Sequence, residues 1–383
     1  MSEQLLVYLD EKLKMTSNDS HLNGIWTNLK KFYTEKLWHH LTLAICEILS
    51  NPDCKGLVSA REIYQNLVSK FEGKINLLAL ANICCKASKE FENVQEKCEF
   101  LNEKKSKIDT DFNAKVLIIS ELALIHIANN DKESTRKLVI DNNEVKDISG
   151  VHYWVQAKFY KATNIYYQMI GQHTQFYNHI MRYISCVDVD DLPVTEKIDS
   201  AYKASLAVIL SRDIYNFGEL LAHPIMKVIH DDLEKFWVYD LIHAFNYGNV
   251  KKFFSLKEKW SIQPDLLADT DFMIEKMAQM ALMELALQNK TSSKPISFQQ
   301  IAEFCGISSN EVDEMIMKSM ANNLIDGKVD DVDEILFVDK IQTRVLQNDQ
   351  IIQSKERLNK WIEEINKIKQ FSSKYIKIES EAV

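Results

Sequence analysis

The scarcity of glycine and proline is the feature of this sequence that most limits its fold. The 383 residues include only 9 glycines and 5 prolines, whereas the two together usually make up about 12% of a globular chain. Gly-rich phosphate loops and many-turned β-sandwiches need more of both residues. Long helices need few of them, and hydrophobic residues reach 46%. The composition therefore predicts a mainly helical protein with sizeable cores.

Apolar residues recur every three or four positions through the first half of the chain, as they do on one face of a helix. The stripe from Ile25 to Ile48 predicts one long helix, and further stripes predict four shorter helices, at 63–71, 91–101, 112–127 and 153–167. Short connections between helices favour antiparallel hairpins. We therefore expect residues 1–190 to form a right-handed α-solenoid of helical hairpins. Its aromatic and alanine content is tetratricopeptide-like, although no WxxLGxxY motif sets a repeat period.

Helical stripes continue from 191 to 293. One stripe runs from Leu233 to Phe245 and stops before Gly248. A second stripe consists of methionines: Met273, Met277, Met280 and Met283. A methionine stripe can form an adaptable binding groove. Its helical spacing favours the alternative, packing in a helical core.

The pattern changes near Pro295. Residues 297–304 are expected to form a short helix, Ser308 or Ser309 can cap a second one, and residues 328–338 alternate as strand, acidic turn and strand. Helix, turn, helix and hairpin is the order of a winged helix, which we assign to 294–345. With the helical part at 191–293 it makes a second domain, 191–345.

Residues 346–383 form the last segment, with an amphipathic helix expected from Asn348 to Phe371. Its apolar residues recur in a heptad-like order, and we call them the tail seam: Ile351, Leu358, Trp361, Ile365 and Ile368. A lone helix of this length is marginal in water. The seam therefore needs a partner, which is either the chain's own winged helix or a helix of another protein.

A winged helix suggests DNA binding, but the charge here opposes it. Residues 297–345 carry four basic and ten acidic residues. The second helix has Glu311, Asp313 and Glu314 against Lys318, and the hairpin turn is acidic at 330–334. Phosphate is repelled at both docking elements. The tail is mildly basic, with seven bases against four acids over 348–377, which is weak support for a nucleic-acid site.

Signatures of catalysis and of metal binding are missing from the sequence. It has no GxGxxG, GxxxxGK[ST], HExxH or GxSxG motif, and its seven cysteines include no CxxC pair. No run of about 18 apolar residues suggests a membrane helix, and the first residues do not resemble a signal peptide. We therefore expect no catalytic residue, no cofactor, no metal and no membrane contact.

Several short motifs within residues 150–370 are specific as a set: NFGELLAHP at 216–224, DLIHAFN at 240–246, QPDL at 263–266, FQQIA at 298–302, GKVDDVD at 327–333 and TRVL at 343–346. Together they resemble the PCI family, named for the proteasome lid, the COP9 signalosome and translation initiation factor three. Within it they resemble non-ATPase subunits of the proteasome regulatory-particle lid. Residues 338–343 depart from the family where a Trp-containing strand is expected, which leaves the packing of the second wing strand open.

The resemblance implies a non-catalytic scaffold of the lid that supports ATP-dependent degradation of ubiquitinated proteins. Wing strands of neighbouring PCI subunits would meet edge to edge, with Ile335 and Phe337 as contacts, and the tail seam would enter a helical bundle of lid subunits. A ubiquitin-receptor subunit is a further candidate partner. The resemblance also implies cytoplasmic and nuclear localisation and no homo-oligomer.

Four alternatives remain open: a scaffold of the COP9 signalosome, a scaffold of initiation factor three, a winged-helix nucleic-acid binder and an uncharacterised enzyme.

Overall fold

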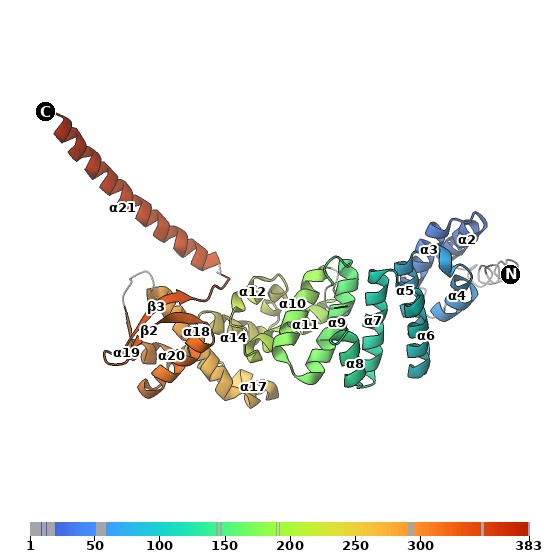
Figure 1. Ribbon diagram of the computed structural model, residues 1–383, viewed down its shortest axis with the longest axis horizontal. Helices are drawn as coiled ribbons and strands as arrows, with labels where there is room; N and C mark the ends of the chain where they lie inside the picture. Colours follow the sequence, from blue (N-terminus) through green and yellow to red (C-terminus); the bar gives the residue numbers. More distant parts are fainter. Residues whose placement is uncertain are drawn as a thin grey trace. The chain divides into compact units, whose positions relative to one another are not determined.

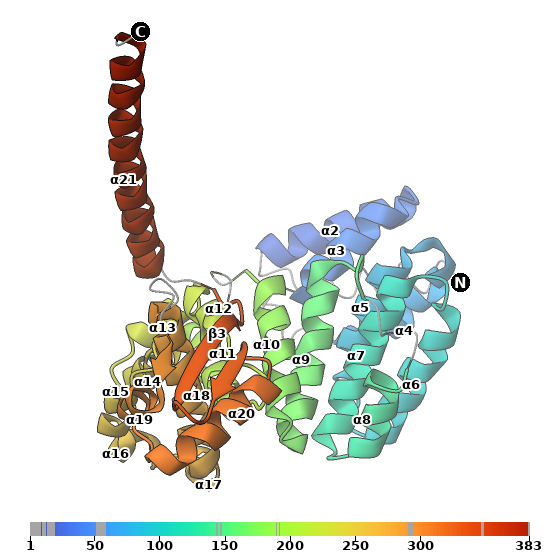
Figure 2. The same ribbon diagram turned by 60° about the vertical axis from the view of Figure 1, so that its left-hand side comes forward.

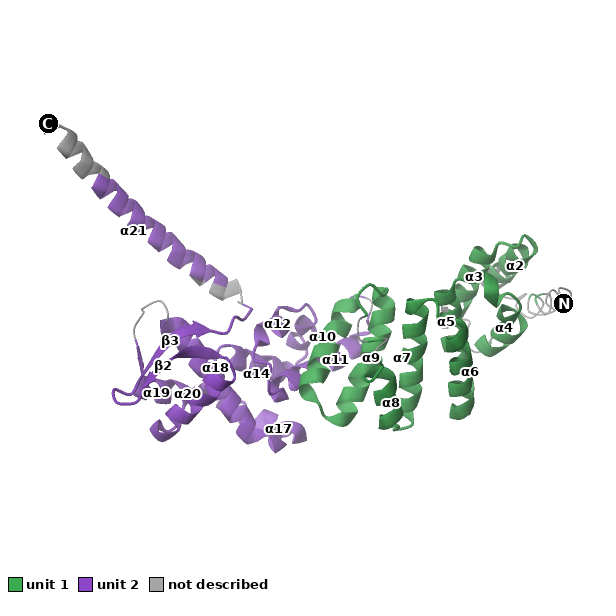
Figure 3. Cartoon of the chain, in the orientation of Figure 1, with its two compact units in different colours: residues 1–188 green, residues 189–383 purple. Residues whose placement is uncertain are grey.

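The computed structural model describes residues 9, 13, 20–50, 59–142, 145, 148–188, 190, 192–289, 295–345 and 348–381. The chain divides into two compact units, residues 1–188 and 189–383 (Figure 3). Both units are built mainly of helices (Figure 1), which confirms the mainly helical fold. We expected a domain boundary between residues 190 and 191. Because positions 189 and 191 are outside the described residues, this boundary stays a prediction.

The first unit is entirely helical in its described residues. Its helices are α2 (Ser20–Thr34), α3 (Trp38–Ser50), α4 (Ala60–Asn66), α5 (Leu77–Ser88), α6 (Val94–Lys107), α7 (Phe112–Ala128), α8 (Lys132–Val139), α9 (Tyr153–Ile170) and α10 (His173–Cys186), with 3-10 turns at Val68–Lys70 and Glu72–Lys74. The main packing contacts among these helices are α2 with α3, α5 with α7, α7 with α9, and α9 with α10. Helix α7 lies inside this series, since most of its side chains are buried.

The single long helix expected from Ile25 to Ile48 is wrong, because the chain turns between α2 and α3. Lys36 has φ 56°, a left-handed conformation that ends a helix. Leu29 and Leu41 are both buried on either side of the turn. The apolar spacing continues across the break, since both helices bury residues at similar intervals, so the stripe gave no sign of the turn.

The helical part of the second unit surrounds one long buried helix. Its elements are α11 (Val194–Leu210), α12 (Phe217–Ala222), α13 (Met226–His230), α14 (Phe236–Asn246), α15 (Val250–Ser255), α16 (Lys257–Trp260), α17 (Pro264–Ala268) and α18 (Thr270–Asn289). The four methionines of α18 are at most 1% exposed, which confirms core packing for that stripe. Leu233 is 96% exposed, because it precedes α14, so its placement in the α14 stripe was wrong.

The winged helix consists of β1 (Ile296–Ser297), α19 (Phe298–Cys305), a 3-10 turn (Ser309–Glu311), α20 (Val312–Ala321), β2 (Ile325–Asp330) and β3 (Ile335–Ile341). From α19 onward this is the expected order. Ser297 caps α19 in a capping box with Gln300, and Ser308 forms a second box with Glu311. The strands contact α18 and α20 (Figure 2). The helix–turn–helix–hairpin prediction is therefore confirmed.

The sheet has the order β1-β3-β2, so β3 is the middle strand. Ile335 pairs with Ser297 on one side and with Asp330 on the other. The expectation of a free strand edge is therefore wrong for Ile335, which is paired on both sides. Phe337 is paired only with Lys328 of β2, so an edge contact at Phe337 stays a prediction. Strand β1, only two residues long, was not foreseen, because so short a strand exists only through its pairing.

The last element is α21 (Asn348–Glu381), longer than the expected Asn348–Phe371. Every described side chain from 351 to 372 is exposed.

Candidate interaction surfaces of the second unit

The residues just before the tail helix are fixed to the helical part of the second unit. Arg344 donates to the backbone oxygen of Asn246 at 2.9 Å and to the carboxylate of Glu284. The backbone N–H of Val345 donates to Asn216 Oδ1 at 3.1 Å. At Gly218, a Cβ would lie 2.3 Å from the Val345 carbonyl oxygen, so only glycine fits this close approach.

The buried ammonium of Lys276 holds α18 against the end of α11. It donates to the carbonyl oxygens of Val208 at 2.8 Å, Ile209 at 3.2 Å and Ser211 at 2.6 Å. A cation there complements the negative end of the helix dipole. Burial lowers the pKa of Lys276 to about 7, because desolvation disfavours the charged form. Sequence reasoning missed this residue, since nothing in a helical stripe marks a buried lysine.

The wing exposes the apolar side chain of Phe337 on β3, beside an acidic turn in which Val332 is also exposed. Phe337 is 43% exposed, Ile335 is half-buried and Leu336 is buried. In the turn, the Asp330 carboxylate accepts from the N–H groups of Val332 at 3.1 Å and Asp333 at 3.2 Å. Of the predicted contact residues, Phe337 therefore offers an exposed side chain to a partner.

The tail seam is exposed along its whole length. Ile351, Leu358, Trp361, Ile365 and Ile368 are 51%, 57%, 67%, 57% and 69% exposed. Sequence reasoning missed three further exposed residues of the same helix: Ile352, Ile362 and Phe371. Exposed apolar surface of this extent is typical of a protein interaction site.

Among the described residues, no group of three or more His, Cys, Asp or Glu side chains is placed to hold a metal ion. No described helix is long and apolar enough to cross a membrane.

Two protein families match this chain. Residues 25–242 match the family described as PSD13 N-terminal repeats, and residues 246–340 match the PCI domain. Probable 26S proteasome regulatory subunit rpn9 of Schizosaccharomyces pombe is 30% identical, over 89% of this chain and 89% of its own length. The 26S proteasome non-ATPase regulatory subunit 13 homolog B of Arabidopsis thaliana is 28% identical, over 90% and 92%.

A relative from another complex matches less of the chain. COP9 signalosome complex subunit 7 of Dictyostelium discoideum is 30% identical over only 39% of this chain. The resemblance to the non-ATPase lid subunits, and to subunit nine in particular, is thus confirmed by the relatives that match at full length. The chain belongs to the family of 26S proteasome non-ATPase regulatory subunit 13, with its N-terminal repeats and its PCI domain.

Proposed function

We propose that this chain is a non-catalytic scaffold subunit of the proteasome regulatory-particle lid, supporting ATP-dependent degradation of ubiquitinated proteins. It acts by binding neighbouring PCI subunits through its winged helix and by contributing its tail helix to a bundle of lid helices. The protein works in the cytoplasm and the nucleus.

The exposed tail seam is the observation that carries this proposal. Five apolar side chains, each more than half exposed, follow one helix. In water such a helix loses the stabilisation that its apolar side chains would gain by burial, about 25 cal/mol for each Å². A bundle of partner helices recovers it, and the chain at Arg344 and Val345 is held to the helical part of the second unit.

Full-length coverage favours the proteasome over the other PCI complexes. The match to eukaryotic translation initiation factor 3 subunit M of Dictyostelium discoideum is 22% identical over 59% of this chain, far short of the coverage by the proteasome subunits. Acidic residues at both docking elements of the winged helix also disfavour a nucleic-acid partner.

Replacing the native protein in cells by a chain that ends at residue 347 tests the proposal. We expect less 26S particle on native gels and more polyubiquitinated protein, while the shortened chain still accumulates as folded protein. A variant with polar substitutions on the opposite face of α21, Glu363→Gln with Lys367→Gln, serves as the control. A normal amount of 26S particle with the shortened chain would contradict the bundle.

A further inference from the structure

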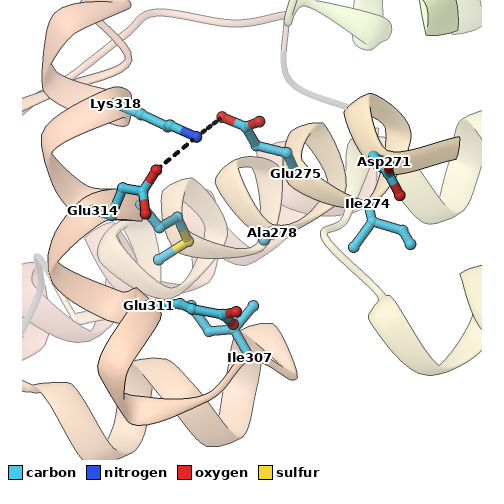
Figure 4. A pocket seen from close by; sticks show the side chains of 9 residues that line it. Asp271, Ile274, Glu275, Ala278, Ile307, Glu311, Glu314 and Lys318 are labelled. Atoms are coloured by element: carbon cyan, nitrogen blue, oxygen red, sulfur yellow. Dashed lines mark ion pairs between the residues drawn. The ribbon is translucent and has the colours of Figure 1, made fainter. Parts of the chain in front are cut away.

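A groove with an apolar floor lies between α18 and α20 of the second unit (Figure 4). Its volume is about 270 Å³. Ala278 and Met315 are buried and form the floor, while Ile274 and Ile307 stand at the walls. A groove of this size takes one or two side chains and not a cofactor, for which sites usually reach about 300–1,000 Å³.

Carboxylates dominate the rim of this groove. Asp271 and Glu275 come from α18, Glu311 and Glu314 from the start of α20, and Lys318 is the single basic residue among them. Lys318 is already shared, since its ammonium pairs with Glu275 at 3.2 Å and Glu314 at 3.1 Å (Figure 4). These hydrogen bonds, first the one to Glu314, raise the pKa of Lys318. The charge of Lys318 is therefore balanced by ion pairs with two of the four carboxylates.

The other two carboxylates, Asp271 and Glu311, form no ion pair with any described residue. Glu311 accepts only a backbone N–H, that of Ser308 at 3.4 Å. Both side chains are exposed. Two uncompensated negative charges thus stand beside an apolar floor.

We propose that this groove binds a protein segment that presents an apolar side chain flanked by lysine or arginine. The apolar side chain fills the floor over Ala278 and Met315, and the flanking cations pair with Asp271 and Glu311. In nucleic-acid-binding winged helices the second helix contacts DNA. Here that helix, α20, carries negative charge, so it would bind a basic protein segment instead.

Binding of a designed peptide to the full chain tests this inference. The probe is an acetylated, amidated alanine-based helix of twelve residues with one central leucine and a lysine three or four positions to either side. Asp271→Asn with Glu311→Gln should weaken its binding about fivefold, the loss expected for two partly exposed ion pairs. Glutamine keeps the capping box at Glu311, and an unchanged melting temperature verifies the fold.

A matched variant separates a local effect from the charge of the whole chain. Asp331→Asn with Asp333→Asn removes the same charge at the wing turn and should leave binding unchanged. A peptide with glycine in place of the leucine should bind several-fold more weakly, and spermidine should compete poorly. Equal loss in the two double variants, equal binding of the glycine peptide, efficient competition by spermidine, or no binding of the probe by ~1 mM would each overturn the inference.

Discussion

Arg344 and Glu284 form a buried ion pair that joins the end of the winged helix to the central helix α18. Their side chains are 6% and 10% exposed, and the same guanidinium donates to the backbone of Asn246. Removing one partner of a buried pair leaves the other charge uncompensated, which costs about 3–5 kcal/mol. We predict a loss of this size in the free energy of unfolding for Arg344→Met, measured by urea denaturation of the full chain.

The half-exposed pairs of Lys318 supply the control for this prediction. Because water screens them, Lys318→Met should cost less than about 1 kcal/mol. Similar losses in the free energy of unfolding for the two variants would contradict the claim that burial makes the Arg344–Glu284 pair more stabilising than the pairs of Lys318.

Substitution of Lys276 should also lower the free energy of unfolding. Lys276→Met leaves the buried carbonyl groups of Val208, Ile209 and Ser211 without their donor. We expect a loss of about 2 kcal/mol in the free energy of unfolding, from the desolvated carbonyls. A more stable variant would mean that burying the ammonium costs more than its hydrogen bonds return.

The first unit should lose stability at mildly acidic pH through His179. Burial lowers the pKa of His179 to about 4 from 6.5, and its Nδ1 lies 2.9 Å from Thr163 Oγ1. Between pH 6.5 and 4 the unfolded chain binds a proton that the folded chain does not, so stability falls as the pH falls. We predict a loss of about 1–2 kcal/mol over this range, allowing for partial exposure.

Urea denaturation at pH 6.5 and pH 4.5 measures that loss. The variant His179→Gln should show a smaller pH dependence than the natural chain, whereas His152→Gln, at an exposed position, should not change it. An unaltered pH dependence in His179→Gln would contradict the assignment.

Local signals explain what the sequence could predict. Ser308 was recognised as a candidate helix cap because a capping box involves residues only three positions apart, whereas Ser297, expected as the first residue of its helix, is the cap of α19. The hairpin was recognised because strand and turn residues follow one another along the chain. The heptad spacing likewise identified the tail seam without any structure.

Long-range contacts explain what was missed. Arg344 meets Glu284 across 60 residues and Asn246 across 98, and no spacing rule links such positions. The order β1-β3-β2 depends on pairing between residues 296 and 336, so sequence reasoning did not show that Ile335 is paired on both sides. The groove between α18 and α20 likewise joins two helices whose contact no periodicity reveals.

The side chain of Phe337 is the part of the wing at which we test contact with a neighbouring winged helix. Phe337→Pro would disrupt the middle strand and so disturb folding as well as assembly. Phe337→Ser removes the exposed ring with little change in melting temperature, and we expect loss of one winged-helix neighbour on co-purification. Val332→Ser, at a 92% exposed position of the turn, should retain that neighbour. Full assembly of Phe337→Ser would argue against the β3 face as a contact.

Trp361→Ala combined with Ile365→Ala tests the tail seam. Both side chains are exposed in the free chain, so its melting temperature should stay within about 2 °C. Incorporation into the complex should fall, because large aromatic side chains dominate interface energies. A large drop in melting temperature would instead indicate that the seam packs within the chain.

The most direct test of the account is affinity purification of the tagged full chain from its own cells, followed by mass spectrometry of the bound proteins. We predict recovery of the proteasome lid subunits that carry PCI domains, together with the rest of the 26S particle, and a reduced yield of all of them with the tail double variant. Recovery of COP9 signalosome or initiation factor subunits in their place would contradict the assignment to the lid.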